Sequence, residues 1–220
     1  MNKLLSTIFA LAAFGGATFA VQAQDIKASA AAGEKKAAMC IGCHSIPGYQ
    51  ASFPEVHKVP MISGQGAKYI TSALNAYKKG ERKHPTMKSI AVTLNDQDVA
   101  DLAAFYEEQG KKAPTETQSA PKPSEQVAKL LEQTKCNTCH GQNFNTPLDP
   151  SYPKLGGQHA DYLYVALKSY QTANNPQVGR SNPIMMGMVA QLTHAQLKEL
   201  AQYLASLPSE LHTVPQARFR

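Results

Sequence analysis

Apolar residues recur at helical spacing in two places along this chain of 220 residues. Each set of four would lie on one face of an α-helix. The sets are Val99, Leu102, Ala103 and Tyr106, and Leu197, Leu200, Ala201 and Leu204. A capping box from Thr193 to Gln196 precedes the second set, and Asn95 stands in the equivalent place before the first. The pattern therefore predicts two similar helices, each with its apolar stripe in a core.

Shorter amphipathic stretches predict further helices. One covers residues 67–79, and a counterpart covers 160–173. Residues 125–135 and an Ala- and Lys-rich stretch before Cys40 predict two shorter ones. No stretch alternates apolar and polar residues with a period of two, so little sheet is expected. The predicted fold class is all-α.

The first 23 residues have the pattern of a cleavable secretory signal. An apolar run from Leu4 to Phe19 follows Lys3, and Val21-Gln22-Ala23 provides small residues for a signal peptidase. The run is short and interrupted by glycine for a membrane span, although an uncleaved signal acting as an anchor is the alternative. No later run is long and apolar enough to span a bilayer. We expect a soluble mature protein that starts at Gln24.

The chain is an internal duplication of domain length. The matched segments are Pro60–Gln65 and Pro153–Gln158, Ala73-Leu74 and Ala166-Leu167, Tyr77 and Tyr170, Arg82–Met87 and Arg180–Met185, Leu94 and Leu192, and Leu102 and Leu200. Two small domains are expected at residues 24–110 and 124–210. Residues 111–123 are rich in Lys and Pro and predict an extended linker, and residues 211–220 form a tail.

Two copies of one five-residue motif contain every cysteine of the chain. The copies are Cys40-Ile41-Gly42-Cys43-His44 and Cys136-Asn137-Thr138-Cys139-His140. C-x-x-C-H is the attachment motif of c-type haem. Its thiols form thioethers with the porphyrin vinyl groups, and its histidine binds the iron. The sequence therefore predicts two covalently bound haem c groups, with His44 and His140 as proximal ligands.

Two other uses of paired cysteines fit the sequence less well. A redox disulfide of the thioredoxin type occurs near a βαβ pattern, which this sequence lacks. One tetrahedral zinc ion would take both cysteine pairs but would leave the histidine after each pair unexplained. Thioether formation consumes all four thiols, so no disulfide is expected. Haem attachment also agrees with export to the oxidising periplasm.

Electron-carrying haems need a sixth iron ligand, and methionine opposite histidine raises the reduction potential. Each half has an R-x-x-P-x-M segment, which ends at Met87 in the first half and at Met185 in the second. We expect these two methionines to be axial ligands. Met186 and Met188 compete with Met185, and His84 competes with Met87, although the second half has no histidine at that place.

Two matched pairs of residues are candidates for contacts around the haems. The carbonyl oxygens of Pro60 and Pro153 could accept a hydrogen bond from Nδ1 of the proximal histidine, which would fix the ring. Arg82 and Arg180 are candidates for pairing with haem propionates. The alternative for each arginine is an ordinary solvated surface charge.

The net charge of the chain narrows the choice of partners only slightly. The formal charge of +6 falls to about +5 without Lys3, and to about +3 with two ferric haems whose propionates are ionised. Such weak basicity does not support a nucleic-acid partner. It suits acidic protein partners, or peripheral association with an anionic membrane face.

The tandem C-x-x-C-H halves, each with a P-x-x-x-G-Q segment and an R-x-x-P-x-M segment, resemble the cytochrome c4 family of two-haem bacterial cytochromes. The resemblance implies two helical class I cytochrome c domains with His/Met ligation, whose haem propionate edges face each other. The first half departs from the family pattern at Ser45, where the second half has Gly141, and by a longer segment before Pro60.

The resemblance also implies a function. It implies electron shuttling between quinol-oxidising complexes and terminal oxidases or reductases. With the signal pattern and a methionine candidate in each half, we expect a periplasmic electron carrier that is not an enzyme, with a quinol-oxidising complex or a dehydrogenase as donor and a terminal oxidase or reductase as acceptor. A second hypothesis is a haem subunit of a periplasmic dehydrogenase. A third is an enzyme, such as a two-haem peroxidase or a thiosulfate-oxidising cytochrome, which would need an open iron position or an unusual ligand.

Overall fold

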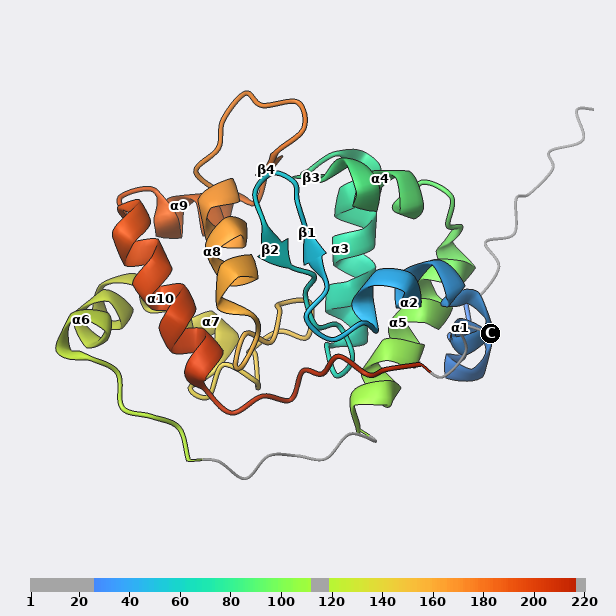
Figure 1. Ribbon diagram of the computed structural model, residues 1–220, viewed down its shortest axis with the longest axis horizontal. Helices are drawn as coiled ribbons and strands as arrows, with labels where there is room; N and C mark the ends of the chain where they lie inside the picture. Colours follow the sequence, from blue (N-terminus) through green and yellow to red (C-terminus); the bar gives the residue numbers. More distant parts are fainter. Residues whose placement is uncertain (1–25, 112–118, 217–220) are drawn as a thin grey trace, which may run out of the picture.

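The chain folds into two helical halves that lie side by side (Figure 1). The computed structural model describes residues 26–111 and 119–216. The expected signal and most of the expected linker lie outside these ranges. The helices of the first half are α1 (Ala30–Lys36), α2 (Ala38–His44), α3 (Ala67–Lys79), α4 (Pro85–Ala91) and α5 (Asp96–Lys111). Those of the second half are α6 (Glu125–Thr134), α7 (Cys136–His140), α8 (Ala160–Ser169), α9 (Pro183–Val189) and α10 (His194–Ser206).

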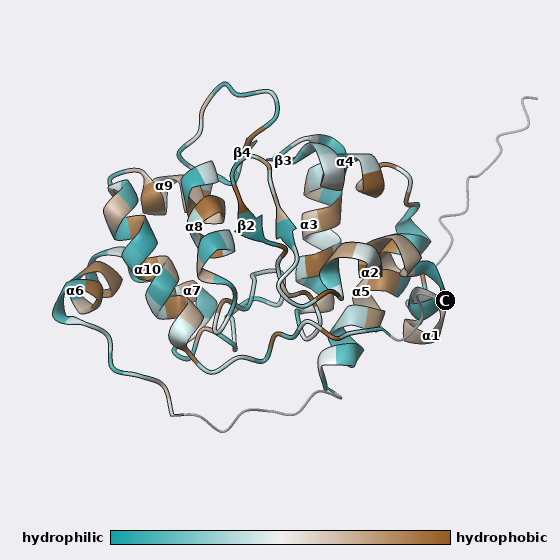
Figure 2. Ribbon diagram, in the orientation of Figure 1, coloured by the Kyte–Doolittle hydropathy of each residue, from teal (hydrophilic) through white to brown (hydrophobic). Residues whose placement is uncertain are grey.

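The two closing helices, α5 and α10, organise the cores as their stripes predict. All eight stripe residues are buried. Helices α1 and α3 pack on α5, and α6 and α8 pack on α10. The capping box at Thr193 and Gln196 is present at the start of α10. Hydrophobic and hydrophilic residues alternate along these helices (Figure 2), as amphipathic packing around a core requires.

The predicted helix over 160–173 is too long, because α8 ends at Ser169. Beyond this point the backbone N–H groups of Tyr170 and Gln171 bond to carbonyls three residues back, at 3.1 and 3.0 Å, which is a tighter turn than an α-helix. Asn174 then takes a left-handed φ of 56°. The Gln171 side chain also donates to the carbonyls of Val189 and Leu192, at 2.6 and 2.7 Å. Contacts made far along the chain therefore end this helix.

Short strands join the two halves, and the sheet content is small, as expected. The strands are β1 (Gln50–Ala51), β2 (His57–Lys58), β3 (Arg82–Lys83) and β4 (Gly179–Arg180). β1 and β2 form an antiparallel hairpin in the first half. β3 of the first half pairs with β4 of the second, which places Arg82 opposite Arg180. The hairpin itself reaches across to α8, where the Lys58 N–H donates to Asp161 at 3.0 Å.

The segment after α10 returns to the first half (Figure 1). His212 forms a bridge with Ser63, and its N–H donates to the Ser63 carbonyl at 2.9 Å. Leu211 is almost fully buried. Gly64 has a left-handed φ of 91°, and a Cβ atom there would lie 2.0 Å from the Glu210 carbonyl oxygen. The tail is therefore packed against the first half, with a glycine where the two backbones meet.

No helix of the described residues has both the length and the apolar character needed to cross a membrane.

Candidate functional site

Each cysteine motif forms a short helix that ends at its histidine. α2 ends at His44 and α7 ends at His140. Residues three apart on a helix lie on roughly the same side, a spacing that suits two neighbouring vinyl groups. All four cysteines are partly buried. Burial raises the pKa of the Cys40 and Cys136 thiols before haem attachment converts them to thioethers.

Both motif histidines are held by a proline carbonyl of their own half. Nδ1 of His44 lies 2.9 Å from the Pro60 oxygen, and Nδ1 of His140 lies 3.0 Å from the Pro153 oxygen. A carbonyl oxygen only accepts, so Nδ1 carries the proton and Nε2 keeps a free lone pair. Burial lowers the pKa of both histidines, although the hydrogen bond to the proline carbonyl raises it. Both rings are therefore neutral, the form that binds iron.

The two R-x-x-P-x-M segments form matching helix starts. In α4 and α9 the proline occupies the first turn, and the residue before it is the N-cap. Nδ1 of His84 accepts from the Met87 N–H at 3.4 Å, and the Asn182 side chain accepts from the Met185 N–H at 3.0 Å. His84 therefore has the same capping role as Asn182. This role explains its position next to Met87 without iron ligation.

One cavity of about 790 Å³ extends through both halves of the molecule. Its lining includes the predicted site residues Cys40, Cys43, His44, Pro60, Arg82 and Met87 of the first half and Cys139, His140, Pro153, Arg180 and Met185 of the second. Cys136 is not part of this lining and packs against an apolar core of the second half. A histidine and a methionine of each half therefore line the same cavity.

The competing methionines of the second half lie elsewhere. Met186 and Met188 are 40% and 45% exposed and are not part of the cavity lining. Met185 lines the cavity and packs against the core. The structure therefore favours Met185 among the three.

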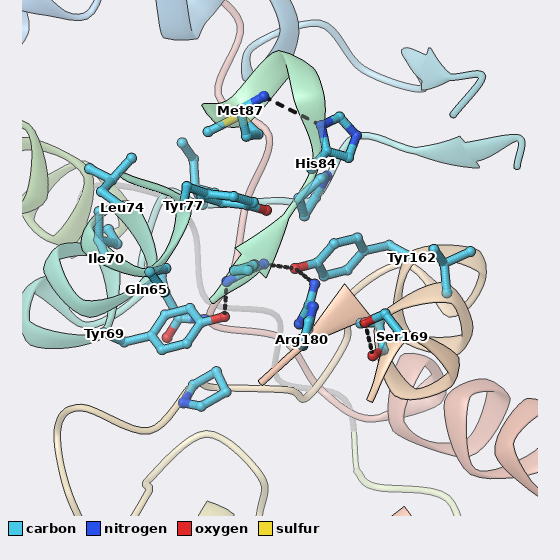
Figure 3. A pocket seen from close by; sticks show the side chains of 18 of the residues that line it. Gln65, Tyr69, Ile70, Leu74, Tyr77, His84, Met87, Tyr162, Ser169 and Arg180 are labelled. Carbon is cyan, nitrogen blue, oxygen red and sulfur yellow. Dashed lines mark hydrogen bonds between the residues drawn. The ribbon is translucent and has the colours of Figure 1, made fainter. Parts of the chain in front are cut away.

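The two arginines lie opposite each other on the paired strands β3 and β4, where the halves meet. Figure 3 shows Arg180 next to Tyr162. Arg82 donates to the hydroxyl oxygens of Tyr69 at 3.0 Å and Tyr162 at 2.6 Å. Arg180 donates to the Tyr162 hydroxyl at 3.2 Å. Burial raises the pKa of Tyr162, but the positive charges of Arg82 and Arg180 outweigh burial and bring it to about 8. Neither arginine is the ordinary solvated charge of the alternative interpretation.

This arginine pair indicates that the cavity holds an anionic group. No Asp or Glu of the described residues forms a salt bridge with Arg82 or Arg180, and Nε of Arg82 is buried without a hydrogen-bond partner. Two neighbouring, partly buried cations without a counter-ion are unfavourable. The propionates of a haem would supply the missing negative charge, while the apolar lining suits the porphyrin. The residues present therefore fit two haems.

The sequence interpretation missed the tyrosines around the arginines. Tyr69 and Tyr162 occupy equivalent places, four residues after the matched Gln65 and Gln158. Arg82 also lies over the Tyr77 ring, 4.7 Å from its centroid. The duplication makes Tyr69 and Tyr162 recognisable as equivalent residues. Only the fold shows that both contact the arginines where the halves meet.

Comparison with known proteins agrees with this geometry. The family described as cytochrome c matches residues 30–109 and again 124–208. Cytochrome c4 from Thiocapsa roseopersicina is 30% identical over 185 residues, which cover 80% of this chain and 91% of that protein. The chain belongs to the cytochrome c4 family. The crystal structure of reduced recombinant cytochrome c4 from Pseudomonas stutzeri superimposes with a TM-score of 0.61 at 28% identity, covering 82% of this chain and all of that one.

A further relative has a more specific name. The thiosulfate dehydrogenase electron acceptor of Thiomonas intermedia is 29% identical over 191 residues, covering 82% of this chain and 84% of that protein.

Together with the two attachment motifs, family membership establishes two class I cytochrome c domains with one covalently bound haem c each. Each haem, when bound, supplies a one-electron iron couple.

Proposed function

We propose that this protein is a periplasmic two-haem electron carrier in which each half ligates its iron with one histidine and one methionine. The observation that supports the proposal is the shared cavity, whose lining includes one motif histidine and one candidate methionine from each half. A carrier needs both axial positions filled, because an open position favours ligand binding and chemistry at the iron.

The described residues divide the work of holding the haems. Cys40, Cys43, Cys136 and Cys139 would form the thioethers, and His44, His140, Met87 and Met185 would be the axial ligands. The carbonyls of Pro60 and Pro153 would fix the imidazole rings, which the two hydrogen bonds support. Arg82 and Arg180 would pair with the propionates.

The arrangement of the arginines supports electron exchange inside the molecule. Because β3 and β4 place Arg82 opposite Arg180, propionates bound by the two would meet between the halves. The haem edges would then be neighbours, so an electron accepted by one half could pass to the other. The chain would carry up to two electrons.

The proposed setting is the respiratory chain of the periplasm. The signal pattern of residues 1–23 supports export. A quinol-oxidising complex or a dehydrogenase would donate electrons, and a terminal oxidase or reductase would accept them. The weakly basic chain suits acidic docking surfaces or an anionic membrane face.

A second candidate function is an electron-accepting haem subunit of a periplasmic dehydrogenase. The relative named as a thiosulfate dehydrogenase electron acceptor favours it. A haem enzyme is less well supported, because a methionine lines the cavity in each half.

Haem content, redox titration and native purification test the proposal. We expect two haems per chain that survive denaturing electrophoresis, and two reversible one-electron steps in the positive range typical of His/Met ligation. Loss of haem on denaturation, or a strongly negative step, would contradict the proposal. Purification from native periplasm and membranes separates the two roles, because a subunit stays with its dehydrogenase in stoichiometric amount and a carrier does not.

A further inference from the structure

Two peptide groups at the boundary between the halves are each hydrogen-bonded at both ends. The peptide that joins Pro60 to Met61 accepts through its oxygen from Nδ1 of His44, at 2.9 Å. Its N–H donates to Oε1 of Gln158, at 3.1 Å. One peptide group therefore links the proximal histidine of the first half to a glutamine of the second.

The second half repeats the arrangement in the opposite direction. The peptide that joins Pro153 to Lys154 accepts from Nδ1 of His140 at 3.0 Å, and its N–H donates to Oε1 of Gln65 at 2.9 Å. The glutamines also return a hydrogen bond. Nε2 of Gln158 donates to the Met61 carbonyl at 2.9 Å, and Nε2 of Gln65 donates to the Lys154 carbonyl at 3.1 Å.

The orientation of both side-chain amides is fixed. Gln65 and Gln158 are only 4% and 3% exposed. Oε1 of Gln65 also accepts from the Gly66 N–H at 3.1 Å, and Oε1 of Gln158 accepts from the His159 N–H at 3.0 Å. Each oxygen thus faces two N–H donors and each nitrogen faces a carbonyl, so a flipped amide would lose every one of these bonds.

We propose that Gln65 and Gln158 are positioning residues that tune the haem of the opposite half. Gln158 acts on the haem bound by His44, and Gln65 acts on the haem bound by His140. The inference rests on the histidine ligation proposed above and adds a crossed dependence between the halves. Each reduction potential then contains a contribution from the packing of its neighbour.

The physical basis is polarisation along a chain of hydrogen bonds. When the N–H of a peptide donates, its carbonyl oxygen becomes more negative and accepts more strongly. A stronger acceptor at Nδ1 makes the imidazole a more basic ligand. A more basic ligand stabilises ferric iron. Loss of Gln158 should therefore raise the potential of the first haem, and loss of Gln65 should raise that of the second.

Gln158→Leu and Gln65→Leu test the proposal, because leucine roughly keeps the side-chain volume and removes the amide. For each variant we expect about a twofold change in the reduction equilibrium of the crossed haem, or ~18 mV at 59 mV per tenfold change. The haem of the substituted half should move less. The two haems are distinguished by following assigned, hyperfine-shifted haem methyl resonances through a redox titration of the holoprotein.

Gln97→Leu is the matched control, since it makes the same uncharged substitution at a glutamine of α5 whose amide bonds to Lys27 and Asp101 and touches neither peptide. It should leave the difference between the two potentials unchanged. If the leucine variants lose haem, Gln158→Asn and Gln65→Asn, whose amides are one methylene too short to keep both bonds, should give the same crossed direction.

The proposal is overturned if each variant moves mainly the potential of its own half, moves both equally, or moves neither. Such a result in a protein whose wild type shows two His/Met steps leaves the proposed carrier function intact. Failure of the carrier function would appear earlier, in the wild-type titration itself.

Discussion

The two halves are alike where they face the cavity and differ in the loop that follows each haem motif. Ser45 ends α2 with a φ of −107°, whereas Gly141 follows α7 with a left-handed φ of 82°. A Cβ atom at Gly141 would lie 2.1 Å from the Thr146 carbonyl oxygen, so glycine is required there. The first half instead continues into the β1–β2 hairpin, which reaches α8. The loop between histidine and proline is therefore free to differ, and in the first half it contacts the partner half.

The halves also differ on the side away from the cavity. In the first half, Lys36 of α1 forms salt bridges with Asp98 at 2.8 Å and with the buried Asp101 of α5 at 2.7 Å. In the second half, α6 packs on α10 through buried Val127 and Leu130. The same pairing of an N-terminal helix with the closing helix therefore combines apolar contact with an ion pair to the buried Asp101 in the first half and rests on apolar contact in the second.

Removal of the attachment cysteines, one half at a time, has the largest expected effect. Cys136→Ala with Cys139→Ala should leave one haem per chain, and Cys40→Ala with Cys43→Ala should leave the other. Haem staining after denaturing electrophoresis and haem content per chain measure this. Loss of both haems from either double variant would show that the halves do not mature separately.

Removal of the methionine ligands comes next. Met87→Ala and Met185→Ala should each abolish about half of the long-wavelength absorbance of ferric iron bound to methionine sulfur, and each should open one haem to carbon monoxide. Met186→Ala and Met188→Ala are the controls and should leave the spectrum unchanged, because these side chains are exposed. A spectral loss in either control would identify that methionine, in place of Met185, as the axial ligand of the second half.

Loss of an arginine should shift a potential without loss of haem. Arg82→Gln removes a positive charge that favours ferrous iron, so the potential of the nearer haem should fall by about 1 kcal/mol, or ~40 mV for one electron. Arg180→Gln should act in the same direction on the haem nearer to it, because it removes the same positive charge. Redox titration measures both, with the exposed Lys129→Gln as a control that should change little.

The smallest expected effect is a loss of stability in acid that is specific to the ion pair of the first half. The hydrogen bond from Lys36 lowers the pKa of Asp101, although burial raises it. A lowered carboxyl pKa contributes stability above the unfolded value, near about 3.9, and this contribution is lost as the pH falls through the lower folded value. The gap in urea midpoint between wild type and Asp101→Asn should therefore close as the medium becomes acidic. A gap that persists in strong acid would contradict this role of the ion pair.

Local signals in the sequence predicted the elements that form locally. The helix over 67–79, the capped closing helices and their buried stripes are confirmed. The hydrogen bonds of His44 and His140 to the proline carbonyls are also present. They could be predicted because the duplication places a proline at the same point after each motif. Neighbouring residues determine these features, so periodicity and motif spacing reveal them.

The features that join the halves could not be predicted in this way. The β3–β4 pairing and the exchanged glutamine contacts depend on residues far apart in the chain. Each peptide and each glutamine looks ordinary in its own half, and its role exists only after the halves have packed. The early end of α8 has a similar cause, since Gln171 bonds to carbonyls that follow α9.

The return of the tail gives the second half two attachments to the first. Residues 212–215 line one pocket with Ala30, Ala31 and Glu34 of α1. The second half is therefore connected to the first both at its start, through the chain, and at its end, through the packed tail. A second tether raises the effective concentration at which separated halves meet again. Each opening of the boundary should then be brief, and the pair of haems should keep its spacing while larger proteins collide with and leave the surface.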